Sequence, residues 1–170
     1  MKVGGAHLTY CTNIHPGERW DEIRASLERY LPEVKRRVSP HAPFGVGLRL
    51  SAIAAQALSE PGELAAFKAF LADHGLYVFT VNGFPYGPFH GTRVKEDVYL
   101  PDWRDPARLE YTNQLADLLV QLTPQGLDTP ASISTVPGAF KPAAAADEAV
   151  ARIVEHVLRH AAHLVELERA

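Results

Sequence analysis

The sequence predicts an α/β fold, specifically a (β/α) half-barrel in which four parallel βα units form one half of a TIM-barrel-like domain. Short apolar runs rich in β-forming residues alternate with longer segments of helical periodicity, which implies a parallel sheet with right-handed crossovers. The chain has 170 residues, whereas a whole eight-stranded barrel needs about 250. The alternative, a doubly wound sheet, is disfavoured because the turn after the first strand has no glycine-rich fingerprint.

Four segments have the pattern of strands: His7–Cys11, Phe44–Leu50, Tyr77–Val81 and Ser132–Val136. The third is apolar apart from Thr80, which is typical of a strand covered on both faces. In the second, Gly45 and Gly47 alternate with larger residues, which suits a crowded interior. We expect the strands to lie side by side in chain order with helices on the convex face, and Cys11 to be buried within the first strand.

The first helical segment spans about residues 18–38, and the second begins at Ser51. The first has apolar residues at three- and four-residue spacing, and Pro32 inside it predicts a kink or a break. The second pauses after Leu58, restarts at Pro61, and has Gly75 as its C-terminal cap.

The last two helical segments begin near Asp105 and Ala144. Asp105 followed by proline is an N-cap signature. The final helix, to about Glu168, carries eight apolar residues that we expect to face inward: Val150, Ile153, Val154, Val157, Leu158, Ala161, Leu164 and Val165. We expect three histidines at helical spacing on this helix to lie on the surface: His156, His160 and His163.

Composition indicates one domain over residues 1–170, with 46% hydrophobic and 22% charged residues. A net charge of −3 gives no general attraction to nucleic acid or anionic lipid. No apolar run approaches the length of a membrane span, and no signal segment is visible at the N-terminus. A single cysteine excludes an internal disulfide. We therefore expect a cytoplasmic protein that binds neither nucleic acid nor membrane.

Two strand exits are unusually rich in proline, glycine and hydrogen-bonding side chains. Residues 82–91 carry three glycines, two prolines, three aromatic residues, an asparagine and a histidine, and residues 12–18 resemble them in character. Ordinary connections are short and polar, whereas stiff loops with stacking and hydrogen-bonding groups are suited to ligand binding. Because both loops follow strands, we expect them to line one pocket at the C-terminal face of the sheet.

Six residues are the candidates for this pocket. We assign His15 and His90 to catalysis and Asn13, Arg49, Asn82 and Tyr86 to substrate binding, and we assign no metal ligands. For His15 the alternative is a loop histidine that caps the first helix, and for Asn13 it is turn chemistry.

Arg49 lies near the end of an apolar strand, where an arginine needs an anionic partner. The sequence leaves two partners open. One is a carboxylate or phosphate of a ligand, held bidentately. The other is an internal acid such as Glu18.

Four segments carry a resemblance to a known family: residues 7–18, 82–91, 98–103 and 132–138. They read HLTYCTNIHPGE, NGFPYGPFHG, VYLPDW and SISTVPG, and they resemble the metabolite-traffic proteins called EboE, over about residues 7–165. That family is similar to xylose-isomerase-like sugar-phosphate isomerases. The resemblance implies a xylose-isomerase-like TIM barrel of which this chain is the N-terminal half. It also implies that full-length members can hold a divalent metal, mostly at the ends of later strands.

Two functions follow as expectations. The first is metabolite handling of the EboE type, with a small polar metabolite bound at the C-terminal face of the strands. The second is a metal-dependent sugar or sugar-phosphate isomerase or epimerase, inactive as this truncated chain. In either case a half-barrel has two open strand edges and an uncovered apolar concave face. We therefore expect a second half-barrel or a homodimer to cover them.

Overall fold

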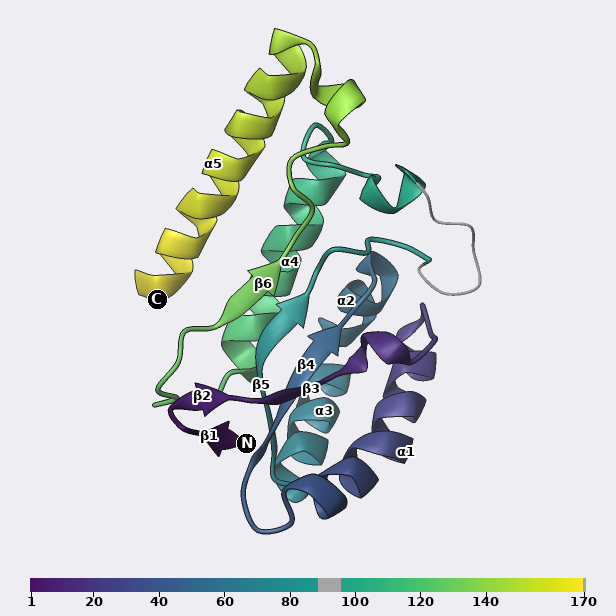
Figure 1. Ribbon diagram of the computed structural model, residues 1–170, viewed down its shortest axis with the longest axis vertical. Helices are drawn as coiled ribbons and strands as arrows, with labels where there is room; N and C mark the ends of the chain where they lie inside the picture. The colour runs from purple at the N-terminus through teal and green to yellow at the C-terminus, as the bar shows by residue number, and fades with distance from the viewer. Residues whose placement is uncertain (89–95, 170) are drawn as a thin grey trace.

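The computed structural model describes residues 1–88 and 96–169 and shows a four-stranded parallel sheet among helices (Figure 1). The strands are β3 (Thr9–Cys11), β4 (Phe44–Arg49), β5 (Leu76–Asn82) and β6 (Ser132–Ser134), and their order in the sheet is β3-β4-β5-β6. Each neighbouring pair is parallel. The predicted α/β class and the sequential strand order are therefore confirmed. A short antiparallel hairpin, β1 (Lys2–Val3) and β2 (Ala6–His7), precedes the sheet.

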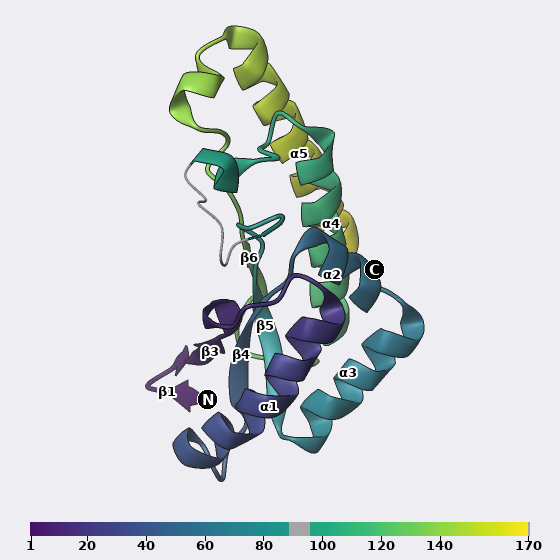
Figure 2. The ribbon, with the colours of Figure 1, turned by 90° about the vertical axis from the view of Figure 1, so that its right-hand side faces the viewer.

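Four helices cover one face of this sheet (Figure 2). They are α1 (Trp20–Val38), α2 (Ala52–Leu58), α3 (Pro61–Asp73) and α4 (Pro106–Leu122). Both predicted caps are present: the Asp105 carboxylate accepts from Ala107 N, and Gly75 has a positive φ. The Ser51 hydroxyl, which accepts from Ala54 N, caps α2 in addition. Short 3-10 turns occupy Thr12–Ile14 (η1), Glu96–Tyr99 (η2) and Lys141–Ala144 (η3). None of the helices in the described ranges has the length and apolar composition that crossing a bilayer requires.

The core lies between the sheet and these helices. Val46, Leu48 and Val78 are fully buried there, and Val81 nearly so, against apolar residues from all four helices. In β4 the core residues alternate with residues on the opposite side of the sheet, as the two-residue period of a strand requires. In β5 a register shift after Val78 brings Val81, three residues on, to the same face. The hydrophobic core therefore uses only one face of the sheet.

The opposite face, called here the open face, is built mainly from small and polar side chains. Register and hydrogen bonds place on it Thr9, Cys11, Gly45, Gly47, Thr80, Asn82, Ser132 and Ser134. A Cβ atom at Gly45 would lie 2.8 Å from Leu8 O, so the close approach of β3 and β4 requires glycine there. The expectation of an apolar face was wrong, because these positions carry hydroxyls, amides and glycines instead of aliphatic side chains.

Two aromatic residues of the open face are covered by the N-terminal hairpin. Tyr77 and Phe79 are buried, and both rings contact the ring of His7 edge-on. His7 Nε2 donates to Asp128 Oδ1 (2.7 Å), and Tyr77 OH donates to His7 Nδ1 (2.9 Å). Lys2 also pairs with Asp128. The hairpin thus links β5 to the loop before β6 and covers the two aromatic side chains of the open face.

Three local expectations were wrong. Cys11 is exposed, because it projects from the open face instead of into the core. Helix α1 continues without a break through Pro32, since Leu31 before the proline and Val34 after it both pack on the core. The first strand is divided at Leu8, which separates the hairpin from β3.

Helix α5 (Asp147–Arg169) differs most from expectation. Six of the eight residues predicted to face inward are 41–64% exposed: Val150, Val154, Val157, Leu158, Leu164 and Val165. Ile153 does pack inward, against Trp103, Leu109 and Val136.

The histidines predicted to lie on the surface of α5 instead form its contact with neighbouring elements. Buried His156 donates from Nδ1 to Trp103 O (2.8 Å). His160 Nδ1 bonds Asn113 Oδ1, and His163 Nε2 bonds Asp117 Oδ1, both at 2.7 Å. Because these polar contacts turn the histidine side of α5 toward α4, most of the apolar stripe faces solvent.

The packing of α5 against α4 should weaken in acid. Burial, and secondly His163, lower the pKa of His160 below its ordinary value of 6.5. The unfolded chain therefore takes up this proton before the folded chain does, and stability falls as pH decreases through and below that value. We expect the melting temperature of His160→Gln, measured by circular dichroism from about pH 7 to about pH 5, to fall less steeply than that of the wild type.

His41→Gln is the matched control, because His41 lies exposed in the loop before β4. It should leave the pH profile unchanged. Parallel profiles for wild type and His160→Gln would show that His160 does not contribute to the acid sensitivity.

Candidate functional site

Arg49 connects three strand exits from inside the protein. It ends β4 and is only 2% exposed. Its guanidinium donates to Gly17 O (2.5 Å) and to the Glu18 carboxylate (2.6 Å), both after β3, and to Gly87 O (3.3 Å), after β5. Of the two partners that the sequence left open, the internal one, Glu18, is therefore present. The ion pair compensates for the cost of burying a charge at the edge of the sheet.

The backbone of the loop after β5 is held in place from outside the loop. All five consecutive carbonyls from Gly83 to Gly87 accept a hydrogen bond. The donors in order are Arg108 Nη1, Arg108 Nη2, Tyr111 OH, Ala52 N and Arg49 Nη2. Buried carbonyls need such partners. The loop therefore has a fixed backbone from which its side chains project.

Arg108 and Tyr111, on α4, supply three of these five bonds. Arg108 is fully buried, donates from Nε to Pro101 O (2.7 Å), and lies over the rings of Tyr86 and Tyr111. Desolvation by burial lowers the pKa of Arg108, and burial raises the pKa of the Tyr111 phenol. The phenol is thus a permanent donor, to Leu50 O (2.6 Å) as well as to Pro85 O.

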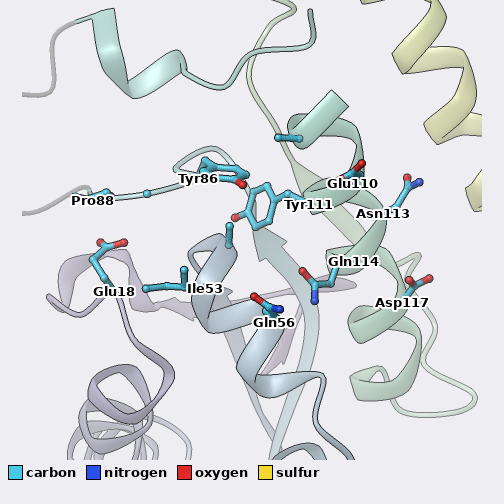
Figure 3. A pocket seen from close by; sticks show the side chains of 13 residues that line it. Glu18, Ile53, Gln56, Tyr86, Pro88, Glu110, Tyr111, Asn113, Gln114 and Asp117 are labelled. Atoms are coloured by element: carbon cyan, nitrogen blue, oxygen red, sulfur yellow. The ribbon is translucent and has the colours of Figure 1, made fainter. Parts of the chain in front are cut away.

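A cleft of about 720 Å³ opens between α2 and α4 beside this loop (Figure 3). It is lined by Glu18, Ala52, Ile53, Gln56, Tyr86, Gly87, Pro88, Ala107, Glu110, Tyr111, Asn113, Gln114 and Asp117. These residues follow β3, β4 and β5 or lie on α4 between Ala107 and Asp117. The cleft therefore lies where the carboxyl ends of three parallel strands meet two helices.

The polar groups of the cleft are amides and carboxylates. Gln56 and Gln114 enter from α2 and α4 respectively (Figure 3), and Gln114 Nε2 also donates to Ser59 Oγ. Glu18 and Glu110 supply carboxylates, while Tyr86 supplies an aromatic face. No lysine or arginine is among the described residues that line the cleft. The acidic groups on this lining are Glu18, Glu110 and Asp117, of which Glu18 is paired with Arg49 and Asp117 with His163.

The cleft also touches the contact between α4 and α5. Asn113 and Asp117 lie on its rim, and their side-chain oxygens bond His160 and His163 of α5. The two acceptors are therefore already engaged on the α5 side, which leaves Gln56, Glu110 and Gln114 as the main polar groups for a ligand.

The predicted site residues that the structure describes do not all line one pocket: Tyr86 lines this cleft, whereas His15 and Arg49 line a small neighbouring one. Tyr86 lines the cleft, and Arg49 lies behind it, bonded to Glu18. His15 bonds Tyr10 OH (3.0 Å) and stacks on Tyr30 of α1, with ring centroids 4.4 Å apart. These described contacts of His15 lie on the α1 side.

Asn82 and Asn13 occupy two other surroundings. On the open face, Asn82 Oδ1 accepts from Phe84 N (3.1 Å) and Ser134 Oγ (2.8 Å). Asn13 is half-buried in the η1 turn. His90 lies outside the described residues. The catalytic and binding roles assigned to these residues stay predictions.

Sequence reasoning missed the α4 side of the cleft. Arg108, Tyr111 and Gln114 lie in the helix that begins near Asp105, for which the sequence predicted an N-cap and no site residue. The available signal was Arg108 itself, which stands next to Leu109 at the start of a helix with many leucines. Arginine is rarely buried unless its guanidinium has hydrogen-bond partners, so an arginine at this position indicates such partners. A search restricted to loops after strands overlooks helix residues of this kind.

The divalent metal implied by the family resemblance has no fitting donor set in the part of the chain that the structure describes. Within residues 1–88 and 96–169, no three His, Cys, Asp or Glu side chains are grouped closely enough to hold a metal ion. Most zinc centres of enzymes have at least three protein ligands, and magnesium and calcium sites are built mainly from oxygen ligands. The described residues therefore do not fit the implied metal.

No protein-family model, curated protein or solved structure matches this chain. The resemblance to EboE-type proteins therefore stays a prediction. Function is inferred from the cleft and from the strand exits that form it.

Removing the Arg49 guanidinium should destabilise the fold. Arg49→Met leaves the Glu18 carboxylate without this cation and two loop carbonyls without a donor, so we expect a loss of about 3 kcal/mol in the free energy of unfolding. Urea denaturation measures the loss. Hydrogen exchange should show faster exchange of backbone amides near Gly17 and Gly87, the two places that Arg49 ties together.

Arg36→Met is the control, because Arg36 forms an exposed ion pair with Glu33 on α1. It should change stability little. Equal losses for the two variants would contradict the role assigned to Arg49.

Proposed function

We propose that this chain is an EboE-type metabolite-handling protein, built as one half of a (β/α) barrel, which binds a small polar metabolite in the cleft between α2 and α4. The ligand class is a compound with several hydroxyl or amine groups and no phosphate or carboxylate. The observation that carries the proposal is the convergence of three strand exits on one polar cleft whose neighbouring loop is fixed through five consecutive carbonyls.

The sequential parallel sheet supports the half-barrel part of the proposal. Strand order β3-β4-β5-β6 with α1–α4 on one face is the arrangement of consecutive units in a (β/α) barrel. In such barrels, binding sites lie at the carboxyl ends of the strands. The cleft is at that end.

The cleft chemistry supports the ligand class. Gln56 and Gln114 each offer a donor pair and an acceptor, which match hydroxyl groups. Glu110 accepts from a hydroxyl or an ammonium, and the Tyr86 ring offers an apolar face to a carbon skeleton. An anionic ligand would meet the Glu110 carboxylate without a lysine or arginine on the described lining, because Arg49 is already paired with Glu18. A sugar phosphate is therefore disfavoured.

A rigid loop beside the cleft supports binding in another way. Ordering a loop on binding costs free energy that reduces affinity. Here the backbone from Gly83 to Gly87 is already held by Arg49, Arg108 and Tyr111. Tyr86 is therefore positioned before the ligand arrives.

Calorimetric titration with three probes tests the proposal: a neutral aldose or its polyol, a linear polyamine, and an aldose phosphate. We expect binding of the polyol or the polyamine and none of the phosphate. Gln114→Leu should weaken that binding roughly tenfold, the effect of one lost hydrogen bond.

Gln121→Leu is the matched control, since Gln121 lies on the same helix and is not part of the cleft lining. It should leave affinity unchanged. Binding of the phosphate alone, or equal affinity of the Gln114 and Gln121 variants for the bound probe, would refute the proposed cleft and ligand class.

A further inference from the structure

Two edges of the parallel sheet have no partner strand within the described residues. β6 pairs only with β5, and β3 pairs only with β4. Each edge strand is three residues long. An open edge presents backbone donors and acceptors to any strand of suitable direction. Because all four strands are parallel, the β3 edge of one sheet can pair in parallel with the β6 edge of another.

A second, mostly apolar groove lies along the β6 edge. It has a volume of about 390 Å³ and is lined by Ala116, Leu119, Val120, Ala131, Ser132, Ile133, His160, Leu164, Leu167 and Glu168. These residues come from α4, β6 and α5. A side chain from a strand added to β6 would enter this groove on the helix side of the sheet.

The β3 edge carries exposed apolar residues that fit such a groove. Leu8 is 47% exposed directly before β3, and Ile14 is 64% exposed directly after Thr12 and Asn13. Leu8 lies directly before β3, whose Tyr10 packs against the core on the helix side of the sheet. The groove beside β6 is on that same side.

We propose that a second copy of this chain covers these surfaces, with β3 of each copy added in parallel to β6 of the other. The two contacts are identical by two-fold symmetry, so the interface is isologous and closed. Leu8 of one copy enters the groove of the other, and the exposed apolar face of α5 covers the joint. The combined sheet has eight parallel strands, the number that closes a barrel and removes every edge.

The available area agrees with a stable dimer. Helix α5 has 23 residues, so its apolar face is about 35 Å long and about 10 Å wide. Each copy gives one such face and receives the other, which approaches the roughly 800 Å² per partner of a specific interface once the strand edges are added. An open chain of copies, in contrast, would leave one β3 edge and one β6 edge exposed at its ends.

Light scattering after size-exclusion chromatography tests this proposal on the whole chain at micromolar concentration. We expect twice the monomer mass of 18.7 kDa. Val154→Glu/Val157→Glu places charges on the exposed face of α5, and Leu8→Glu places one at the β3 edge. Each variant should raise the dissociation constant roughly 100-fold, as for lost interface anchors, with unchanged circular dichroism because the replaced side chains are exposed in the single copy.

Mixing the two variants provides the decisive comparison. A dimer with one copy of each kind has one intact joint, between α5 of the Leu8→Glu copy and β3 of the other. The mixture should therefore associate more tightly than either variant alone. Val38→Glu, at an equally exposed valine (51%) at the end of α1, should stay dimeric.

Three results would overturn the proposal. A wild-type monomer with a sharp cooperative melt would show that the open edges need no partner. A dimer that persists in both variants would place the interface elsewhere. A mixture no tighter than the separate variants would contradict the pairing of β3 with β6.

Discussion

The fold depends on two buried guanidinium groups that hold the exits of the strands. Arg49 ties the turn after β3 to the loop after β5, and Arg108 ties that same loop to Pro101. A buried arginine is costly unless its planar donors meet acceptors in a matching geometry. Five backbone carbonyls and one carboxylate provide that match here. The edge of the sheet is thereby organised by charge and hydrogen bonding instead of by apolar packing.

In this arrangement, the groups that hold the loop in place differ from the groups that line the cleft. The donors that fix the loop come from inside the protein, whereas the side chains that line the cleft come from helix surfaces and from Tyr86. Substitutions on the cleft surface can therefore change the ligand without disturbing the strand exits. Sites built on regular elements and supported by a second layer of hydrogen bonds are held in more accurate positions than sites on free loops. The small, polar open face and the apolar groove beside β6 are likewise on opposite sides of one sheet.

Local signals in the sequence predicted the element order and two helix caps, because Asp105 and Gly75 act on the backbone beside them. The orientation predicted for α5 was wrong, because its observed orientation depends on hydrogen bonds from its histidines to residues such as Asn113, which is distant in the sequence. The Arg49–Glu18 pair was one of two alternatives, because the pattern indicates that an arginine needs an anion without saying which one. The role of Arg108 was not predicted, because its acceptors are backbone carbonyls, which every residue type has.

The link from Lys2 and His7 to Asp128 has a consequence for how the protein is made. The contacts span more than a hundred residues, so the hairpin leaves the ribosome long before its acceptor does. Tyr77 and Phe79 emerge in the interval and lack their complete cover until residue 128 is free. Contacts between distant residues form late, because loop closure must be completed first. The two rings therefore lack this cover from the time they emerge until Asp128 does, and apolar surface exposed in this way during folding favours aggregation.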